Sequence, residues 1–273
     1  MESNHTLLQL RDISKIFARG SSDEIQALNN IALDVHAGDF ITVIGSNGAG
    51  KTTLMNIIAG TYPPEKGGKI TIDGIDITNF SEHRHAQYVG RVYQDPHVGT
   101  ASKMTIEENL CLAMLRGQAH TLKKATNKQR RAYFRSILAP LGLKLEERLA
   151  APVGTLSGGQ RQGLALVMAT MSKPSILLLD EHIATLDPNT ARKVLELTEM
   201  IVQQEKITTI MITHNMEVAL RHGNRLIMMH KGRIIVDFNQ QQKANLKISD
   251  LITAFEQASG EQFTDDNILL RQN

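Results

Sequence analysis

The stretch Gly45-Ser46-Asn47-Gly48-Ala49-Gly50-Lys51-Thr52-Thr53 decides the fold of this chain. It matches the phosphate-loop pattern G-x-x-x-x-G-K-[ST], and it lies between a short apolar segment at 40–44 and a buried helical segment at 54–59. Glycines let successive backbone N–H groups turn toward one point, and the helix N-terminus adds partial positive charge there. The stretch therefore predicts a strand, a phosphate-binding turn and a helix.

Two side chains of this stretch carry the expected chemistry. Lys51 would reach the outer phosphates as a mobile charge, and the hydroxyl of Thr52 would supply one oxygen ligand to Mg²⁺. A glycine-rich turn that binds nothing is the alternative, and the flanking strand and helix argue against it.

Composition limits the class of protein. The chain has 273 residues with 30 basic and 28 acidic side chains, a balance that gives no argument for nucleic acid. Its single cysteine, Cys111, excludes an intramolecular disulfide and is expected to be a small core residue on a helix. The polar residues 1–5 are unlike a signal core, and no run of about 18 apolar residues occurs. We expect a soluble protein from a reducing compartment, and any membrane role would have to come from a partner.

Strands flank the phosphate loop in the sequence. Alternating apolar residues or β-branched clusters at 7–17, 31–35 and 69–77 predict antiparallel strands, with a turn at Asp73-Gly74. Phe17 ends the first of them, and both stacking on a nucleotide base and core packing remain open for it. A hairpin is expected across Lys231-Gly232, followed by a short amphipathic helix at about 249–258.

Polar residues follow three further strand segments. The segment at 88–93 stops at Gln94, the apolar run at 175–179 ends in Asp180-Glu181, and the run at 208–213 delivers His214. Open α/β sheets bind ligands at the carboxyl ends of their strands, so these side chains are expected at one edge. Asp180 could hold Mg²⁺ directly or through water, and Glu181 could accept a proton from an attacking water. The placement of His214 favours function over the structural role usual for a lone histidine.

Between 105 and about 149 the pattern indicates helices inserted between strands. A run of basic side chains lies within this region. A solvated helix face explains the run better than a nucleic-acid patch, because few aromatic residues lie between the basic ones. The run consists of Lys123, Lys124, Lys128, Arg130, Arg131 and Arg135. His83 and His85 have metal-like spacing without further ligands nearby, so they are expected in a loop.

A second glycine-containing helix start occurs at Leu156-Ser157-Gly158-Gly159-Gln160. Ser157 is a good N-cap, and the two glycines expose backbone N–H groups, which predicts another anion-binding terminus. An ordinary capped helix is the alternative, but tandem glycines there would cost stability without a close backbone approach. A further helix is expected from Asp187-Pro188, with proline in its first turn.

With these motifs in this order, the chain resembles the ATP-binding subunit of an ABC transporter over nearly all of its length. The resemblance implies an α/β fold: a P-loop NTPase core with an antiparallel β subdomain and an inserted α-helical subdomain. Residues 1–273 would form one such domain. Its core with the β subdomain would cover 1–94 and 152–240, its helical insertion 95–151 with the signature helix from about 156 packing on it, and its C-terminal extension 241–273.

The resemblance also assigns roles to individual residues. Phe17 would stack on adenine, Glu181 would be the general base, and His214 would contact the γ-phosphate. Gln94 would join Thr52 and Asp180 around Mg²⁺ and also report to a membrane partner. The phosphates would be held by Gly45, Ser46, Asn47, Gly48, Ala49, Gly50, Lys51, Thr52 and Thr53. The ATP of a second copy would be served by Ser157, Gly158 and Gly159. Gln160 and Asp187 would also belong to the nucleotide-binding residues.

ATP and Mg²⁺ are therefore the expected cofactors, and a head-to-tail dimer is the expected working unit. The implied partners are a second copy of the chain, transmembrane permease subunits and, through them, an extracytoplasmic solute-binding protein, with no nucleic acid. The chain would lie on the cytoplasmic face of the plasma (inner) membrane. His182 stands where proline is frequent, and 184–187 reads Ala-Thr-Leu-Asp where Ser-Ala-Leu-Asp is usual. Together with Gly99-Thr100-Ala101 and Thr213-His214-Asn215-Met216, these features resemble bacterial uptake ATPases that work with solute-binding lipoproteins, and they suggest aromatic amino acids as the solute.

Two other functions stay open from the sequence. One is a soluble ABC-type ATPase that acts on nucleic acid, although those relatives carry long coiled-coil arms or two cassettes, for which this chain has no heptads and no room. The other is a nucleotide-binding module without catalysis, which the presence of Gln94, Glu181 and His214 disfavours. Import is favoured over export because no membrane segment is fused to the chain. The segment 96–103 is the expected contact with the permease.

Overall fold

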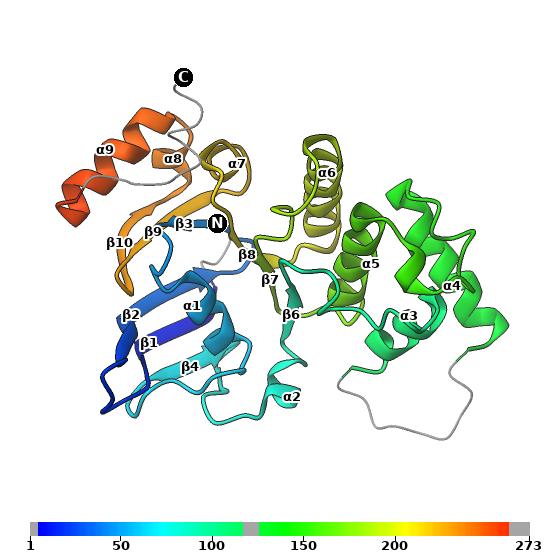
Figure 1. Cartoon of the computed structure of the whole chain (residues 1–273), viewed down its shortest axis with the longest axis horizontal. Helices are drawn as coiled ribbons and strands as arrows, with labels where there is room; N and C mark the ends of the chain where they lie inside the picture. Colours follow the sequence, from blue (N-terminus) through cyan, green and yellow to red (C-terminus); the bar gives the residue numbers. More distant parts are fainter. Residues whose placement is uncertain (1–4, 117–125, 262–273) are drawn as a thin grey trace. The chain divides into compact units, whose positions relative to one another are not determined.

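The computed structural model describes residues 5–116 and 126–261 (Figure 1). The chain forms two compact units, one made of Met1–His85 and Thr208–Asn273 and the other of Ala86–Ile207. The first unit contains the phosphate loop and His214, and the second contains Gln94, the signature and Asp180-Glu181. The domain boundaries expected above remain a prediction.

An antiparallel sheet forms one part of the first unit, with its strands in the order β2-β1-β4-β5. The bounds are Thr6–Phe17 for β1, Ile25–His36 for β2, Lys69–Ile72 for β4 and Ile75–Asp76 for β5. The expected turn at Asp73-Gly74 is confirmed, with φ of 50° and 75° as a tight hairpin requires. The strand expected at 31–35 starts earlier, at Ile25, because its first residues pair with the end of β1 through register shifts.

The phosphate-loop strand β3 lies in a second set of strands, in the order β10-β9-β3-β8. Its neighbours β8 and β9 run parallel to it, whereas β9 and β10 form an antiparallel hairpin. Strand β3 spans Phe40–Gly45, β8 Thr208–Ile212, β9 Arg225–His230 and β10 Arg233–Phe238. All five residues of β8 are buried, as expected of a parallel strand covered on both faces.

The helices of the first unit lie around these strands. They are α1 (Lys51–Ile58), α2 (Glu82–His85), α7 (Met216–Arg221), α8 (Gln240–Lys243) and α9 (Ile248–Ser259). The expected C-terminal helix is confirmed as α9, which buries Leu251 and Phe255 in a cluster with Met228 of β9. The assignment of His83 and His85 to a loop was wrong. Both lie in the short helix α2, and His85 is buried with Nδ1 3.1 Å from the carbonyl oxygen of Ile58.

The second unit combines a parallel pair of strands with helices. Strand β6 spans Val89–Val92 and pairs in parallel with β7, Ile176–Asp180. The helices are α3 (Ile106–Met114), α4 (Lys128–Leu138), η1 (Ala139–Leu141), η2 (Val153–Thr155), α5 (Gly158–Thr170) and α6 (Pro188–Glu205). Cys111 is buried on α3, which confirms its expected core role. Burial raises the pKa of its thiol.

The helical character expected between 105 and 149 is confirmed in the described residues. Helix α3 begins with a capping box, in which Thr105 accepts from the backbone of Glu108 and the Glu108 carboxylate accepts from Thr105. In the basic run, Arg131 forms an ion pair with Glu107 at 2.6 Å, while Lys123 and Lys124 lie outside the described residues.

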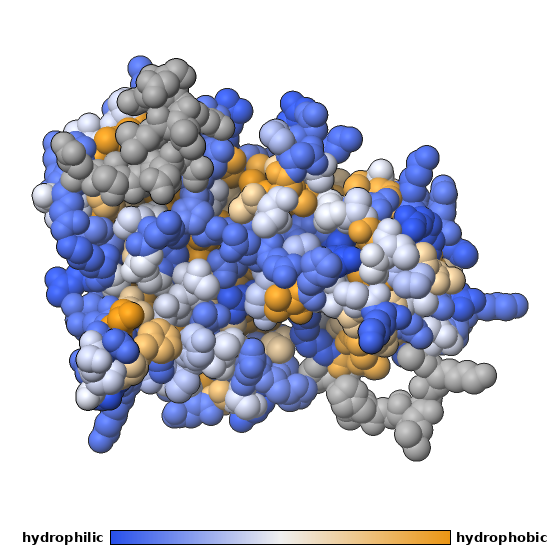
Figure 2. Space-filling model, in the orientation of Figure 1, coloured by the Kyte–Doolittle hydropathy of each residue, from blue (hydrophilic) through white to orange (hydrophobic). Residues whose placement is uncertain are grey.

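The visible surface is mostly polar. Figure 2 shows hydrophobic residues in small groups among hydrophilic ones, and the large apolar side chains that are exposed in the described part come from separate elements. They are Ile25, Tyr62, Ile75, Val98, Leu112 and Tyr133. Within 5–116 and 126–261, no helix is both long and apolar enough to cross a membrane.

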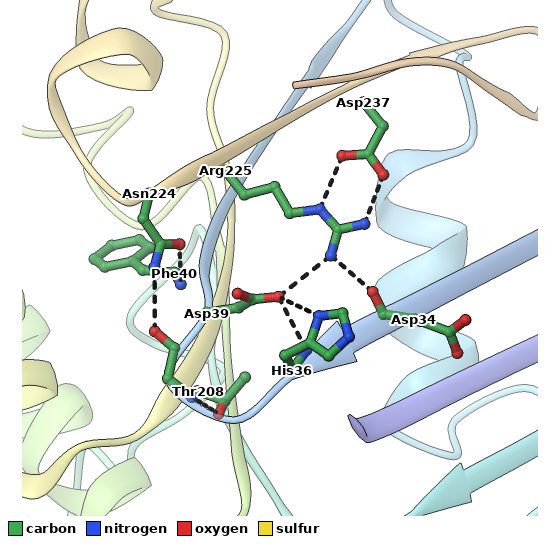
Figure 3. Close-up of polar contacts among 9 residues, drawn as sticks. Asp34, His36, Asp39, Phe40, Thr208, Asn224, Arg225 and Asp237 are labelled. Carbon is green, nitrogen blue, oxygen red and sulfur yellow. Dashed lines mark hydrogen bonds and ion pairs between the residues drawn. The ribbon is translucent and has the colours of Figure 1, made fainter. Parts of the chain in front are cut away.

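Arg225 joins the strands of the first unit at the end away from the phosphate loop (Figure 3). Its guanidinium donates two hydrogen bonds to Asp237 at 2.8 and 2.6 Å, one to the carbonyl oxygen of Asp34 at 2.7 Å, and one to Asp39 at 3.2 Å. The hydrogen bonds to Asp237 raise the pKa of Arg225 further. The arginine is thus a cross-link between β9, β10, β2 and the start of β3.

Replacing Arg225 with methionine is expected to lower the free energy of unfolding by about 2 kcal/mol, since it leaves the half-buried carboxylate of Asp39 and the more exposed carboxylate of Asp237 without their cation. Urea denaturation followed by circular dichroism measures the change. Arg11→Met is the matched control, because Arg11 also binds a carboxylate, Asp34, but both side chains are 43% exposed and the loss should be below about 1 kcal/mol. Equal losses in the two variants would contradict a structural role for Arg225.

Candidate nucleotide-binding and catalytic site

The phosphate loop joins β3 to α1 and depends on glycine at two positions. Gly50 has a φ of 95°, and a Cβ there would lie 2.4 Å from the carbonyl oxygen of Ala27. At Gly45 a Cβ would lie 2.1 Å from the carbonyl oxygen of Met229. Both obstacles are backbone atoms, so neither position accepts a side chain. Packing of the surrounding backbone therefore also requires the two glycines of the motif.

The β9–β10 hairpin packs against this loop. The N–H of Gly232 donates to the carbonyl oxygen of Ala49 at 3.1 Å, and the N–H of Asn29 on β2 donates to the carbonyl oxygen of Gly232 at 2.9 Å. Two segments that are distant from the loop in sequence, the β9–β10 hairpin and β2, thus help to fix its shape.

Lys51 begins helix α1 and is 6% exposed. Its Nζ lies inside the curve of the loop, where it donates to the carbonyl oxygens of Gly45 at 2.6 Å and Ser46 at 3.0 Å. The next residue, Thr52, is exposed in the first turn of the helix. The ammonium and the helix N-terminus therefore place positive charge at one point, which suits a polyphosphate.

His214 follows β8 at the same edge of the strands as the phosphate loop. Val43 and Ile212 are partners in the parallel pair, and each lies two residues before the functional segment that follows its strand. The Asn215 side chain accepts from the N–H of Val218 at 3.1 Å and so starts α7 directly after the histidine. His214 is half-buried. The structure thus brings His214 and the loop to one edge, as the sequence predicts.

Phe17 is half-buried at the end of β1. Its ring meets that of Tyr62 edge to face, with centroids 5.4 Å apart, and the Nζ of Lys15 lies 5.7 Å from its centroid. One part of the ring therefore packs within the protein and another part is accessible. Stacking on a base remains a prediction for this residue.

In the second unit, β6 and β7 carry the other strand-end residues to a common edge. Val92 pairs with Leu179, so Gln94 and the carboxylates of Asp180 and Glu181 follow neighbouring strand ends. Asp180 is 6% exposed. Its Oδ2 accepts from Nη2 of Arg91 at 3.0 Å, a partner that was not anticipated from the sequence. The sequence signal for this ion pair is the spacing of Arg91 and Tyr93, which lie two residues apart and so on one face of the strand.

Glu181 adopts a left-handed backbone conformation, with φ of 47°. Such a conformation is uncommon for a residue other than glycine, asparagine or aspartate, and its strain is typical of functional positions. The N–H of Ala184 donates to the carbonyl oxygen of Glu181 at 2.9 Å, which closes a turn directly after β7. His182, next in the chain, is buried with Nε2 3.2 Å from the hydroxyl of Thr198 on α6.

The signature helix α5 begins with a capping box. The N–H of Gln160 donates to the Ser157 hydroxyl at 3.3 Å, and the N–H of Ser157 donates to the Gln160 side chain at 3.2 Å. A Cβ on Gly159 would lie 2.3 Å from Cγ2 of Thr190, so the close approach expected for this glycine is an approach to α6 within the unit. Ser157, Gly159 and Gln160 also line an open groove of about 410 Å³.

Asp187 caps α6 and is exposed. The N–H of Thr190 donates to its carboxylate at 3.1 Å, and hydrogen bonds from the side chain and backbone of Thr190 lower the pKa of Asp187. Pro188 follows at the first helical position, as predicted. Asp187 thus has a structural function beside the role that the resemblance implies.

The residues expected around Mg²⁺ offer a suitable donor set. Thr52, Gln94 and Asp180 supply hydroxyl, amide and carboxylate oxygen, the hard ligands that Mg²⁺ takes beside substrate phosphates. The described residues contain no cluster of three or more histidine, cysteine, aspartate and glutamate side chains that could hold a metal by themselves. Oxygen ligands of this kind suit a metal that arrives with phosphate oxygens.

Comparison with known proteins identifies the family of the chain. Residues 28–184 match the family model described as ABC transporter. The chain is 43% identical over 252 residues to the tyrosine transport ATP-binding protein of Clostridioides difficile (strain R20291), which covers 92% of this chain and 100% of the relative. It is 32% identical over 235 residues to the methionine import ATP-binding protein MetN of Bartonella henselae, covering 85% of this chain and 64% of that protein.

Solved structures with the same fold are ATP-binding cassettes. The ADP conformation of one ABC transporter cassette superimposes with a TM-score of 0.74 at 26% identity, covering 94% of this chain and 99% of that one. A dimeric post-hydrolysis cassette bound to ADP and Pi gives a TM-score of 0.71 at 25% identity, covering 86% and 99%. The α/β fold class expected from the sequence is confirmed. This chain belongs to the ABC transporter family, as an ATP-binding subunit and an ATP hydrolase of that family.

Proposed function

We propose that two copies of this chain form a head-to-tail dimer that hydrolyses ATP and drives import of an amino acid through a separate permease. The main support is the 43% identity that extends over the whole tyrosine transport ATP-binding protein. Methionine and spermidine/putrescine import proteins are further relatives, at 32% and 31% identity. Several of these relatives are named as import proteins, which favours uptake over export. Aromatic amino acids are the proposed solute class.

In this proposal the first unit binds most of the nucleotide. Phe17 stacks on adenine, and the amides of 45–53 surround the phosphates together with Lys51. Thr52, Gln94 and Asp180 hold Mg²⁺. When bound, Mg²⁺ supplies neutralisation of the charge on the β- and γ-phosphates.

Hydrolysis then depends on positioning and on one proton transfer. Glu181 accepts the proton of the attacking water, and Gln94 and His214 orient the water and the γ-phosphate. Ser157, Gly158, Gly159 and Gln160, with Asp187, complete the site on the second copy. Closing the dimer excludes bulk water and strengthens each charge interaction inside the site.

The permease is proposed to contact the segment 96–103 at the cytoplasmic face of the membrane, and a solute-binding protein delivers the solute on the other side. Val98 in this segment is 65% exposed. The ring nitrogen Nε2 of His97 lies 2.8 Å from Nη1 of Arg161 on α5, so the same segment is linked to the signature helix. A displacement of this segment would therefore be transmitted through Arg161 to the start of α5 at Ser157.

Uptake by cells tests the proposal directly. In the host of this protein, a chromosomal Glu181→Gln copy is expected to reduce uptake of radiolabelled tyrosine or phenylalanine at least about tenfold, since a single essential step is blocked. Uptake of radiolabelled methionine and spermidine is measured in the same cells. A reduced uptake of either compound would identify it as the transported solute. Parental uptake of all four compounds would contradict the proposed import function.

A further inference from the structure

Arg91 and Asp180 form an ion pair at the place where the metal is proposed to bind. Arg91 is the register partner of Leu178 in the parallel pair of β6 and β7. Side chains of a strand alternate between faces, so Arg91 and Tyr93 share a face with Leu178 and Asp180. The Nη2 to Oδ2 distance is 3.0 Å, and both side chains are 9% exposed.

The guanidinium of Arg91 is held on two sides. Besides its ion pair with Asp180, its Cζ lies 4.5 Å from the ring centroid of Tyr93, within the range of a cation–π contact. Tyr93 immediately precedes Gln94, and its carbonyl oxygen accepts from the Gln162 side chain at 3.2 Å. Arginine remains charged under all ordinary conditions, so this position carries a permanent positive charge.

A buried carboxylate next to a fixed cation binds a second cation less readily. The charge of Asp180 is already compensated by Arg91, and a divalent ion near the carboxylate also repels the guanidinium. Phosphate oxygens can supply the missing negative charge. The pair therefore disfavours metal alone and favours metal together with a nucleotide.

We propose that Arg91 is a positioning residue that competes with the divalent metal for the carboxylate of Asp180, so that metal binds there only with a nucleotide. This inference rests on the proposed role of Asp180. As metal and nucleotide bind, the carboxylate shares its charge with the metal and the guanidinium turns toward Tyr93. The segment that begins at Gln94 thereby senses whether the metal site is filled.

Metal affinity without turnover tests the inference. The full chain is titrated with Mn²⁺ in the presence and absence of ADP, and free Mn²⁺ is measured by electron paramagnetic resonance. The neutral variants Arg91→Gln and Arg91→Met are expected to bind Mn²⁺ at least about fivefold more tightly than the parent with ADP, and to show measurable binding without ADP. Arg91→Lys keeps the charge and should remain within about twofold of the parent.

Arg131→Gln is the matched control, because it also breaks an arginine–carboxylate pair of the second unit but lies on α4. It should leave Mn²⁺ affinity unchanged, whatever its effect on thermal stability. Combining Arg91→Gln with Asp180→Asn should abolish the gain in affinity.

The outcomes separate this inference from the proposed function. If the parent binds Mn²⁺·ADP and the neutral variants bind it equally or more weakly, Arg91 does not compete with the metal and only the inference is overturned. If the gain persists in the Asp180→Asn background, another group holds the metal and the inference is again overturned. If neither parent nor variants bind ADP with Mn²⁺, the proposed nucleotide site is overturned as well.

Discussion

Replacing Glu181 with glutamine is expected to slow ATP hydrolysis by at least about 100-fold while ATP binding is retained, because an amide cannot take the proton of the attacking water. The substitution preserves size and polarity, and Glu181 already has a left-handed backbone conformation that the turn after β7 maintains. Phosphate release measures hydrolysis, and a fluorescent ATP analogue measures binding. The ATP-loaded variant should also elute as a dimer in size-exclusion chromatography.

Glu147→Gln is the control for this variant, since Glu147 is exposed on the same unit and has no assigned role. It should hydrolyse ATP at the parental rate. A Glu181→Gln protein with parental turnover would rule out Glu181 as the base, and an ATP-loaded form that stays monomeric at all concentrations would rule out the dimer mechanism.

Replacing Lys51 with alanine should weaken ATP binding about 10- to 100-fold and abolish hydrolysis at ordinary ATP concentrations, because charge-assisted contacts to the outer phosphates are lost. The side chain is buried within the loop and its ammonium donates to Gly45 and Ser46, so its position is set by the protein. Isothermal titration calorimetry with ATP in the presence of Mg²⁺ measures the change.

Lys173→Ala is the matched control, because the Lys173 side chain is 80% exposed and forms a surface ion pair with Glu205. It should bind ATP like the parent. Circular dichroism confirms that Lys51→Ala remains folded. Unchanged ATP affinity in a folded Lys51→Ala protein would contradict the assignment of the phosphate loop.

Much of the fold could be predicted because its signals are local. The apolar runs at β7 and β8 indicate buried parallel strands, and Asp73-Gly74 and Lys231-Gly232 indicate tight turns, all of which the structure confirms. The first half of β2 was missed because its burial does not alternate, with Ile25 and Gln26 exposed and Ala27 and Leu28 buried, and its strand conformation depends on pairing with β1. Helix α2 was missed because four residues are too few to show a period.

For the candidate site, the sequence places Gln94, Asp180-Glu181 and His214 at the ends of strands but does not give the register between those strands. The contact of Arg91 with Asp180 depends on that register, and so it could not be predicted. The approach of Thr190 to Gly159 depends on how α6 packs on α5, which is tertiary information. The left-handed backbone conformation of Glu181 could not be predicted from the residue type, because glutamate rarely adopts it.

The contact of Gly232 with Ala49 and Asn29 determines when the nucleotide site can form during synthesis. The phosphate-loop motif leaves the ribosome early, but the hairpin that fixes its shape is translated roughly 180 residues later, and such non-local contacts form slowly. A nascent chain that stops before Gly232 therefore carries the complete motif without a shaped loop. We therefore expect nucleotide to stabilise the phosphate loop only after the β9–β10 hairpin has been translated.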